Sequence, residues 1–223
     1  SMNNIIFIGA SSEIAKESIK IFHKNNYNVY SITSKRGEHI SKNVLYVEDY
    51  LDELDKISNF ISGIEKPFVL FFNGYLKENR PINKNPTSSE IQKTYIYNFK
   101  IPYEITQILI KKSLNVEKFI YISSLAVEKL RYKNYIYGYT KNILEKKIQK
   151  LGIDYLILRF GMVRTTMSAG HQGFGLALNK NKAAELIFNN IRKKGIIYPN
   201  IPTKLIGLFL KIFPVKLINR LRL

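Results

Sequence analysis

Short runs of apolar residues, rich in β-branched and aromatic side chains, alternate along this chain with longer segments in which apolar residues recur at helical spacing. The short runs predict seven strands, at residues 5–8, 28–33, 44–47, 68–72, 118–122, 155–159 and 196–198. The longer segments predict helices at residues 13–25, 51–61, 89–112, 135–151 and 182–194. Because the strands are continuously apolar, both faces of their sheet must be covered. The alternation therefore predicts an α/β fold with a parallel sheet.

This pattern is typical of a Rossmann-like, doubly wound parallel sheet of about seven strands, with helices on both faces. The chain has 223 residues, enough for one domain with a substantial core, and 45% of them are hydrophobic, which excludes a disordered chain. We place the domain at residues 1–203 and treat residues 204–223 as a basic amphipathic C-terminal extension. In such a sheet ligands bind outside the carboxyl ends of the strands, so functional residues are expected there.

The absence of Cys limits the chemistry available to this chain. Without Cys there is no disulfide, no thiolate nucleophile and no Cys-ligated metal, which is typical of a reducing compartment, and we expect a cytoplasmic protein. The three His residues lie far apart, without metal-ligand spacing, so no metal is expected (His23, His39, His171). No run reaches the ~18 uninterrupted apolar residues of a membrane span.

The net charge is +18, from 35 Lys and Arg against 17 Asp and Glu. It could reflect a nucleic-acid partner, an anionic membrane, a phosphorylated ligand or only a compositional bias. The sequence shows no recognition helix and no aromatic RNA-binding platform, so we expect no nucleic-acid partner. The acid-free segment 186–223 alone accounts for +8 of the net charge.

The turn after the first predicted strand is suited to an anion. Gly9 permits a tight turn, and the small residues after it let backbone N–H groups approach a ligand at the positive end of the following helix. We therefore predict a pyrophosphate site formed by Gly9, Ser11, Ser12, Glu13 and Ile14. The alternative is an ordinary strand–helix turn with Ser as the helix cap.

The end of the second predicted strand distinguishes between two dinucleotides. An acidic residue there would accept the ribose hydroxyls of NAD, whereas basic residues accommodate the 2′-phosphate of NADP. This chain has Ser34, Lys35 and Arg36 at that position. A hydroxyl and two cations suit a phosphate dianion, so NADP(H) is favoured over NAD(H), the alternative being a solvated basic turn.

Spacing selects one of the fifteen tyrosines. Only Tyr137 is followed by a Lys four residues later, Lys141, and on a helix these two side chains share a face. Ser124 stands thirteen residues before Tyr137, at the end of an apolar strand. This Ser…Tyr-x-x-x-Lys arrangement resembles the active site of the short-chain dehydrogenases/reductases, in their compact single-domain form.

The resemblance implies a role for each matching residue. Tyr137 would exchange a proton with the substrate oxygen, Ser124 would hydrogen-bond that oxygen, and Lys141 would lie beside the nicotinamide ribose and lower the pKa of the phenol. Asn98 falls where the family has an Asn that supports a proton-relay water. Plain structural readings are a strand-ending turn for Ser124 and an exposed polar position for Asn98.

Three further segments extend the resemblance. The turn after residue 8 is similar to T-G-x-x-x-G-x-G, although Glu13 and Ala15 replace the second and third Gly. Asn73-Gly74 follows the fourth strand where the family has N-N-A-G, with only Gly74 in register, and residues 160–165 are similar to P-G-x-V-x-T, with Phe160 in place of Pro. The resemblance implies further cofactor contacts at Asn73, Gly74, Gly161, Val163 and Thr165. The glycine-containing loop 166–179 predicts either a mobile cover over the substrate or a plain surface loop (Gly170, Gly173, Gly175).

Taken together, these features predict an NADP(H)-dependent oxidoreductase that reduces a carbonyl group. Only about 60 residues follow Gly161, too few for the substrate domain of the family's extended members. The extension resembles that of bacterial members acting on polyprenyl-linked sugars, which implies a small-molecule or lipid-linked substrate from cell-envelope polysaccharide synthesis.

Two questions stay open from the sequence. The extension either contacts the inner face of the cell membrane or packs on the core or on a second subunit. The alternative function is a non-catalytic dinucleotide-binding sensor. The family's usual assembly through helices 89–112 and 135–151 implies a homodimer or homotetramer.

Overall fold

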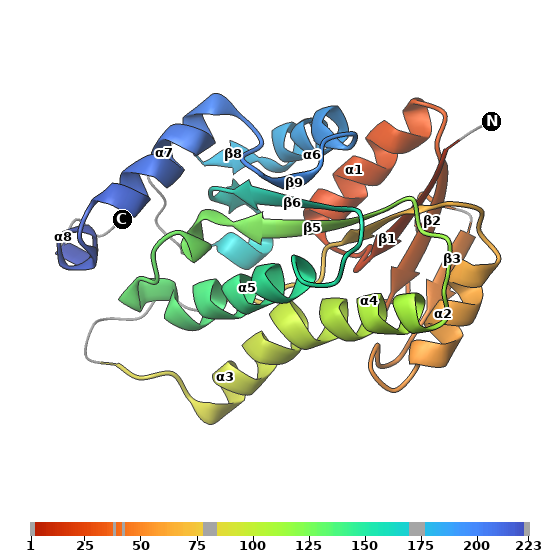
Figure 1. Cartoon of the computed structure of the whole chain (residues 1–223), viewed down its shortest axis with the longest axis horizontal. Helices are drawn as coiled ribbons and strands as arrows, with labels where there is room; N and C mark the ends of the chain where they lie inside the picture. Colours follow the sequence, from red (N-terminus) through yellow and green to blue (C-terminus); the bar gives the residue numbers. More distant parts are fainter. Residues whose placement is uncertain (1–2, 38, 42, 78–83, 170–176, 221–223) are drawn as a thin grey trace.

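The computed structural model describes residues 3–37, 39–41, 43–77, 84–169 and 177–220, and its centre is one parallel sheet (Figure 1). Seven strands lie in the order β3-β2-β1-β4-β5-β6-β9, every neighbouring pair being parallel. They are β1 (Asn4–Ile8), β2 (Asn28–Thr33), β3 (Asn43–Tyr46), β4 (Phe68–Phe71), β5 (Lys118–Ser124), β6 (Tyr155–Phe160) and β9 (Gly195–Ile197). The strand order reverses between β1 and β4. The predicted α/β fold and all seven strands are confirmed.

Helices cover both faces of the sheet, as the continuously apolar strands require (Figure 1). On one face α1 (Glu13–Lys24) packs beside α6 (Lys180–Asn190), over a core that includes Phe7 and Leu158. On the other face α2 (Leu54–Ser62), α4 (Ile101–Lys111) and α5 (Tyr135–Ile148) enclose a second core. Odd and even residues of each strand thus face different cores.

The helix predicted at residues 89–112 is confirmed as an uninterrupted helical segment, but it is not α-helical throughout. It divides into α3 (Ser88–Tyr95), a π-helical turn at Ile96–Lys100 and α4. Pro102 has no backbone N–H, so the bond to the carbonyl of Asn98 that an α-helix needs cannot form. A π turn accommodates this missing bond, and such turns are frequent at functional sites.

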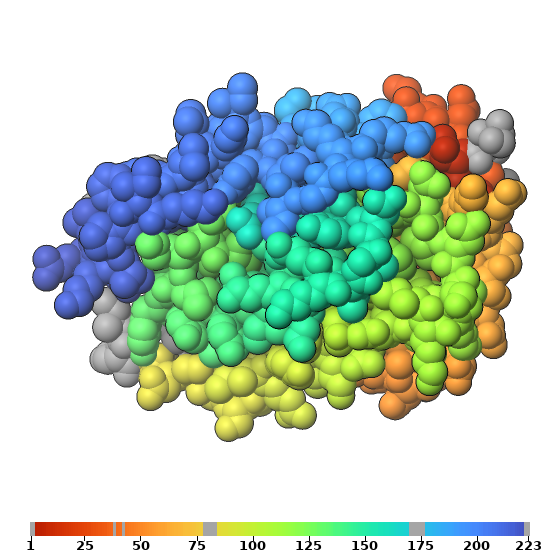
Figure 2. Space-filling view, in the orientation of Figure 1, coloured from red at the N-terminus to blue at the C-terminus, as the bar shows by residue number. Residues whose placement is uncertain are grey.

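Residues beyond β9 form two helices, α7 (Ile201–Ile212) and α8 (Val215–Arg220). The boundary placed between residues 203 and 204 therefore lies inside α7 rather than at the start of an extension. These helices pack through Leu210 and Ile218 on Leu125, which belongs to a short 3-10 helix after β5. Figure 2 shows residues of α7 and α8 on the outside of one end of the molecule.

Two small features follow β6. Strands β7 (Val163–Arg164) and β8 (Leu178–Asn179), which the sequence did not predict, form a second, two-stranded sheet. Half of the predicted cover, residues 170–176 with Gly170, Gly173 and Gly175, lies outside the described residues. Within the described ranges, no helix has the length and apolar character needed to cross a membrane.

Candidate active site

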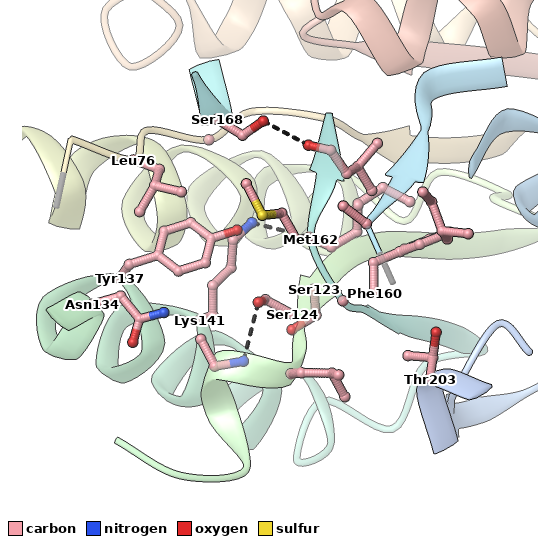
Figure 3. Close-up of a pocket in the computed structure, with 18 of the residues that line it drawn as sticks. Leu76, Ser123, Ser124, Asn134, Tyr137, Lys141, Phe160, Met162, Ser168 and Thr203 are labelled. Carbon is pink, nitrogen blue, oxygen red and sulfur yellow. Dashed lines mark hydrogen bonds between the residues drawn. The ribbon is translucent and has the colours of Figure 1, made fainter. Parts of the chain in front are cut away.

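A cavity of about 600 Å³ lies at the carboxyl ends of the central strands, where a doubly wound sheet binds its ligands. Ten of the predicted site residues line it: Ser12, Ile14, Asn73, Gly74, Ser124, Tyr137, Lys141, Gly161, Val163 and Thr165. Seven others lie outside its wall: Gly9, Ser11, Glu13, Ser34, Lys35, Arg36 and Asn98. The three residues that the sequence spacing selects, Ser124, Tyr137 and Lys141, therefore line the same cavity (Figure 3).

Ser124 and Tyr137 come from different elements and meet at this wall. Ser124 is the last residue of β5, where its Oγ accepts a hydrogen bond from the Ala126 N–H at 3.1 Å. Tyr137 lies in the first turn of α5. Burial raises the pKa of Tyr137 to about 12, although a side-chain hydrogen bond with Ser124 acts in the opposite direction.

The net lowering of the Tyr137 pKa that the sequence predicts is not what the structure gives. Burial raises the pKa of the phenol, because removing a phenolate from water is costly. The Lys141 Nζ lies 5.9 Å from the centroid of the Tyr137 ring and donates to the Ile122 carbonyl at 3.0 Å. Tyr137 is therefore neutral at pH 7 and can donate a proton.

Lys141 is itself buried and perturbed. Burial lowers its pKa to about 8, while the nearby charge of Glu145 raises it. Tyr137, Lys141 and Glu145 follow one another at intervals of four residues, so they share one face of α5. At pH 7 the ammonium of Lys141 remains the prevailing form.

Behind the cavity, a network of buried charged groups fixes Glu145. Its carboxylate accepts from Ser123 Oγ at 2.6 Å and from two nitrogens of Arg159. Arg159 also donates to Glu128 at 2.6 Å, and Glu128 in turn accepts from Tyr198 and pairs with Lys211 at 3.4 Å. The network therefore joins α5, β6 and α7.

Gly138, which the sequence did not single out, allows α5 to approach the chain after Ser124. A Cβ at this position would lie 2.5 Å from the carbonyl oxygen of Ala126, closer than any real Cβ contact. Gly138 is adjacent to Tyr137, so this close packing sets the position of the phenol relative to Ser124. Only the three-dimensional contact, not the spacing, marks this glycine.

Asn98 occupies a structural position beside the cavity. It is fully buried in the π turn, its Oδ1 accepts from the Tyr75 N–H at 2.8 Å, and its Nδ2 donates to the Tyr75 carbonyl at 3.0 Å. A longer bond of 3.4 Å reaches Thr140 on α5. The amide binds the backbone after Gly74, and it thereby fixes the turn that faces Lys141.

The turn after β1 has the close backbone approach expected for an anion site. Gly9 adopts φ +80°, and a Cβ there would lie 2.9 Å from the backbone nitrogen of Asn73. Asn73 follows β4, and its side-chain Oδ1 is buried without a hydrogen-bond partner. A ligand hydroxyl or N–H could satisfy that oxygen, so the residues present fit a nucleotide.

Glu13 connects this turn to the segment after β7. Its carboxylate accepts from the Thr166 N–H at 2.6 Å and pairs with Lys180 at 3.4 Å. The backbone bond from Thr166 is the main reason that the pKa of Glu13 is lowered. Glu13, which is predicted to contact the cofactor, lies outside the cavity wall and holds these two segments together.

The basic turn after β2 lies at the open side of the same sheet edge. Ser34, Lys35 and Arg36 are exposed, and the Arg36 guanidinium lies 5.7 Å from the ring centroid of Tyr46. Beneath the turn, Tyr50 is buried beside Gly9, Asn73 and Ser34, and its burial raises the pKa of the phenol to about 12. Nothing in the sequence distinguished Tyr50 from the other tyrosines.

Two groups of cavity residues had no sequence signal. Arg131, Lys133 and Asn134 line the cavity from the segment that leads into α5. From α7, Leu205, Ile206, Phe209 and Leu210 add an apolar wall, which is why the helices beyond β9 matter for the site.

No protein-family model and no curated protein sequence matches this chain. Solved structures do. A short-chain dehydrogenase from Burkholderia cenocepacia in complex with NADP superposes with a TM-score of 0.77 at 12% identity, over 99% of this chain and 98% of that one. The 4-hydroxyisoleucine dehydrogenase complexed with NADH gives a TM-score of 0.66 at 15% identity, over 89% and 97% of the two chains.

A carbonyl reductase from Pseudomonas aeruginosa is a third similar structure. Its TM-score is 0.68 at 16% identity, and the match covers 88% of this chain and 96% of that one. At identities this low, the superposition establishes the architecture alone. The coverage shows that the match extends over nearly the whole of each chain. The chain therefore has the fold of the short-chain dehydrogenases/reductases, the family whose active-site spacing its sequence resembles.

Proposed function

We propose that this protein is an NADP(H)-dependent oxidoreductase that reduces a carbonyl group to an alcohol. The observation that carries the proposal is the meeting of Ser124, Tyr137 and Lys141 at one cavity, at the carboxyl end of a doubly wound sheet. The carbonyl reductase among the similar structures supports the same reaction class. A sensor without catalysis would have no need for this set of three.

The protonation states of the cavity favour reduction. Tyr137, with its pKa raised to about 12, is a neutral donor and would protonate the oxygen of the carbonyl as that oxygen gains negative charge. Ser124 would hold the same oxygen by a hydrogen bond, and the Lys141 ammonium would stabilise the phenolate that remains. When bound, a reduced nicotinamide supplies the hydride that the carbonyl carbon accepts.

The residues suited to holding the dinucleotide divide between the strand ends. The turn from Gly9 to Ile14 would bind the diphosphate at the N-terminus of α1, and the unpaired Oδ1 of Asn73 would accept from the adenosine part. Lys35 and Arg36 would pair with a 2′-phosphate, which is why NADP(H) is proposed over NAD(H). Structures of this fold occur with either dinucleotide, so the preference rests on this chain's own basic turn.

The test combines binding with turnover. The chain has no Trp, so NADPH binding can be followed by the fluorescence of NADPH itself, and turnover by its absorbance against a panel of keto-sugars and other carbonyl compounds. Tyr137→Phe should bind NADPH with unchanged affinity and lose at least about 100-fold in kcat. A wild-type kcat in Tyr137→Phe would overturn the proposed mechanism. If the wild-type protein binds NADPH but reduces no compound of the panel, the alternative of a non-catalytic sensor is favoured.

Helix α7 supports a finer proposal about the substrate, namely a sugar or lipid-linked sugar met at an anionic membrane surface. Its inner side lines the cavity, whereas its outer side exposes Ile201 to 74% and Ile212 to 78%, next to Lys204 and Lys211. Flotation with phosphatidylglycerol-containing vesicles would test this. The triple variant I201Q/L208Q/I212Q leaves the cavity lining intact and should float less with the vesicles than the wild type does. Equal flotation of the two proteins would contradict the membrane contact.

The proposed homodimer or homotetramer would form through α3 and α5. These helices pack together and expose four large side chains in a described region of the surface: Ile91, Tyr95, Tyr135 and Tyr139. Aromatic residues of this kind are enriched at subunit interfaces. Light scattering of the wild type and of Y135S/Y139S would show whether the assembly depends on this face.

A further inference from the structure

One side of the cavity carries positive charge that the proposed reaction does not use. Arg131 and Lys133 line the cavity with Asn134, on the segment between β5 and α5. Among the described lining residues there is no Asp and no Glu. Lys141, the remaining cation of the lining, belongs to the proposed catalytic set. The lining also contains small and apolar side chains such as Ile14 and Val163.

Arg131 is placed in a way that demands an anionic partner. Its Nε is buried without a hydrogen-bond partner, and it forms no ion pair within the described ranges. Burial lowers the pKa of the guanidinium, because the charged form is partly removed from water. Leaving a guanidinium uncompensated in this way is costly unless a ligand supplies the counter-charge.

The nearest acidic residue in the sequence cannot play that part. Glu128 is already bound by Arg159, Tyr198 and Lys211, and its side chain is only 4% exposed. Arg131 therefore differs from Arg159, the other arginine of this region, which has two carboxylate partners. Arg159 therefore has a structural role, whereas the guanidinium of Arg131 is available to a ligand.

The dinucleotide does not explain Arg131 either. Its diphosphate is assigned to the turn after β1 and its 2′-phosphate to the turn after β2, whereas Arg131 lies beyond β5, on the other side of the strand reversal. Asn134, one helical turn before Tyr137, has a buried Oδ1 without a partner and lies beside the phenol (Figure 3). This corner is thus next to the reacting carbonyl rather than next to the proposed cofactor phosphates.

We propose, on the basis of the proposed carbonyl reduction, that the substrate carries an anionic group, a carboxylate or a phosphate, which Arg131 binds while the carbonyl oxygen lies between Ser124 and Tyr137. The planar guanidinium binds either anion with two parallel hydrogen bonds. Lys133 adds a second positive charge, and Asn134 accepts from a substrate hydroxyl. Apolar side chains cover the rest of the substrate, including Leu76, Met162 and Phe209.

The experiment uses pairs of related probes in which only one member carries the negative charge. For the carboxylate, 4-acetylbenzoate, 5-oxohexanoate and pyruvate are compared with their methyl esters; for the phosphate, dihydroxyacetone phosphate is compared with dihydroxyacetone. Binding is measured by calorimetry on the NADP-loaded full chain, and turnover is followed wherever a probe is reduced. At least one anionic probe should bind about tenfold or more tightly than its neutral counterpart.

The variants assign that difference to one side chain. Arg131→Gln should abolish the preference for the anion and leave the affinity for neutral probes and for NADPH unchanged. Arg131→Lys should retain part of it, because a charge remains without the planar fork. Arg192→Gln is the matched control: it removes the same charge at the opposite end of the sheet, near Phe68, and should change nothing.

Three results would overturn the inference: no anionic probe is preferred, Arg131→Gln weakens neutral and anionic probes alike, or Arg192→Gln has the same effect as Arg131→Gln. The class of anionic probe with the larger gain in affinity over its neutral counterpart shows whether the group is a carboxylate or a phosphate. Failure of the proposed function is a separate result, seen as loss of NADPH binding or as full activity of Tyr137→Phe. The comparison of anion and neutral probe can still be made by thermal shift on the protein without NADP.

Discussion

At the scale of single residues, two neighbouring groups of the site are shifted by burial in opposite senses. Burial raises the pKa of Tyr137 to about 12 and lowers that of Lys141 to about 8. Both shifts favour the neutral form of the side chain, since the charged form is the one that loses solvation. As pH rises, Lys141 therefore loses its proton before Tyr137 does.

This order predicts the pH profile of carbonyl reduction. The proton donor is intact well above neutrality, so kcat/KM should fall above about pH 8, as the Lys141 ammonium is lost. Glu145→Gln removes the negative charge that raises the pKa of Lys141, so the alkaline limb should move to lower pH. Steady-state rates from pH 6 to 10 measure both, with Glu117→Gln, an exposed acid, as the control. An alkaline limb that does not move in Glu145→Gln would contradict the coupling.

The basic turn after β2 yields a second prediction at this scale. The double variant K35Q/R36Q should raise the KM for NADPH by about 100-fold and leave the KM for NADH nearly unchanged, because only NADPH has the 2′-phosphate. The matched control is K20Q/K24Q, which removes two exposed cations from α1. An equal rise in KM for both dinucleotides would show that Lys35 and Arg36 do not bind the 2′-phosphate.

The sequence could predict the residues that spacing marks and not those that packing marks. Ser124, Tyr137 and Lys141 stand out because four residues make one helical turn and a strand ends at Ser124. Arg131 stands out only once its Nε is seen to be buried and unpaired. The pKa of Tyr137 was predicted in the wrong direction, because burial has no signature in spacing.

At the scale of elements, strands were easier to predict than helix interiors. Seven continuous apolar runs gave seven strands, since a sheet covered on both faces accepts little else. The π turn within the helix predicted at 89–112 could not be predicted. Pro102 lies in that helix, but a proline inside an apolar periodic segment can be accommodated in several ways. The predicted extension begins inside α7, at residue 204, because from there on apolar clusters alternate with cations and no acidic residue occurs.

The packing of α5 against the chain after β5 can be tested by one methyl group. Gly138→Ala places a Cβ against the Ala126 carbonyl, so α5 must move and Tyr137 with it. We expect kcat/KM to fall by about 10- to 100-fold and the free energy of unfolding by about 1–3 kcal/mol. Gly63→Ala, whose Cβ would lie 3.7 Å from its nearest neighbour, is the control. Wild-type activity in Gly138→Ala would mean that α5 is free to shift.

At the scale of the whole molecule, buried charges connect layers that the chain visits far apart in sequence. Arg159 on β6 joins Glu145 on α5 to Glu128 after β5, and Glu128 reaches Lys211 on α7. The carboxylates are only 3% and 4% exposed, so each depends on the guanidinium for compensation. The sequence could not predict this network, since its members are spread over more than eighty positions.

Loss of the central cation should therefore destabilise the fold. Arg159→Gln removes the ion pair of the buried Glu145 carboxylate and one of the two pairs of Glu128, and we expect the free energy of unfolding at pH 7 to fall by about 3–5 kcal/mol. Lys194→Gln breaks the exposed pair with Asp154 and should leave the free energy of unfolding nearly unchanged. Urea denaturation measures both, and equal small effects would show that the network is solvated.

The wall that α7 adds to the cavity has a consequence for how such a protein can change over evolution. Every residue assigned to the dinucleotide lies before position 166, whereas Leu205, Ile206, Phe209 and Leu210 face the substrate from a single later helix. Substitutions in that helix can therefore alter substrate range while the cofactor residues are inherited unchanged. One wall of the proposed substrate site is thus encoded in a stretch of the gene separate from the cofactor residues, where selection can act on it independently.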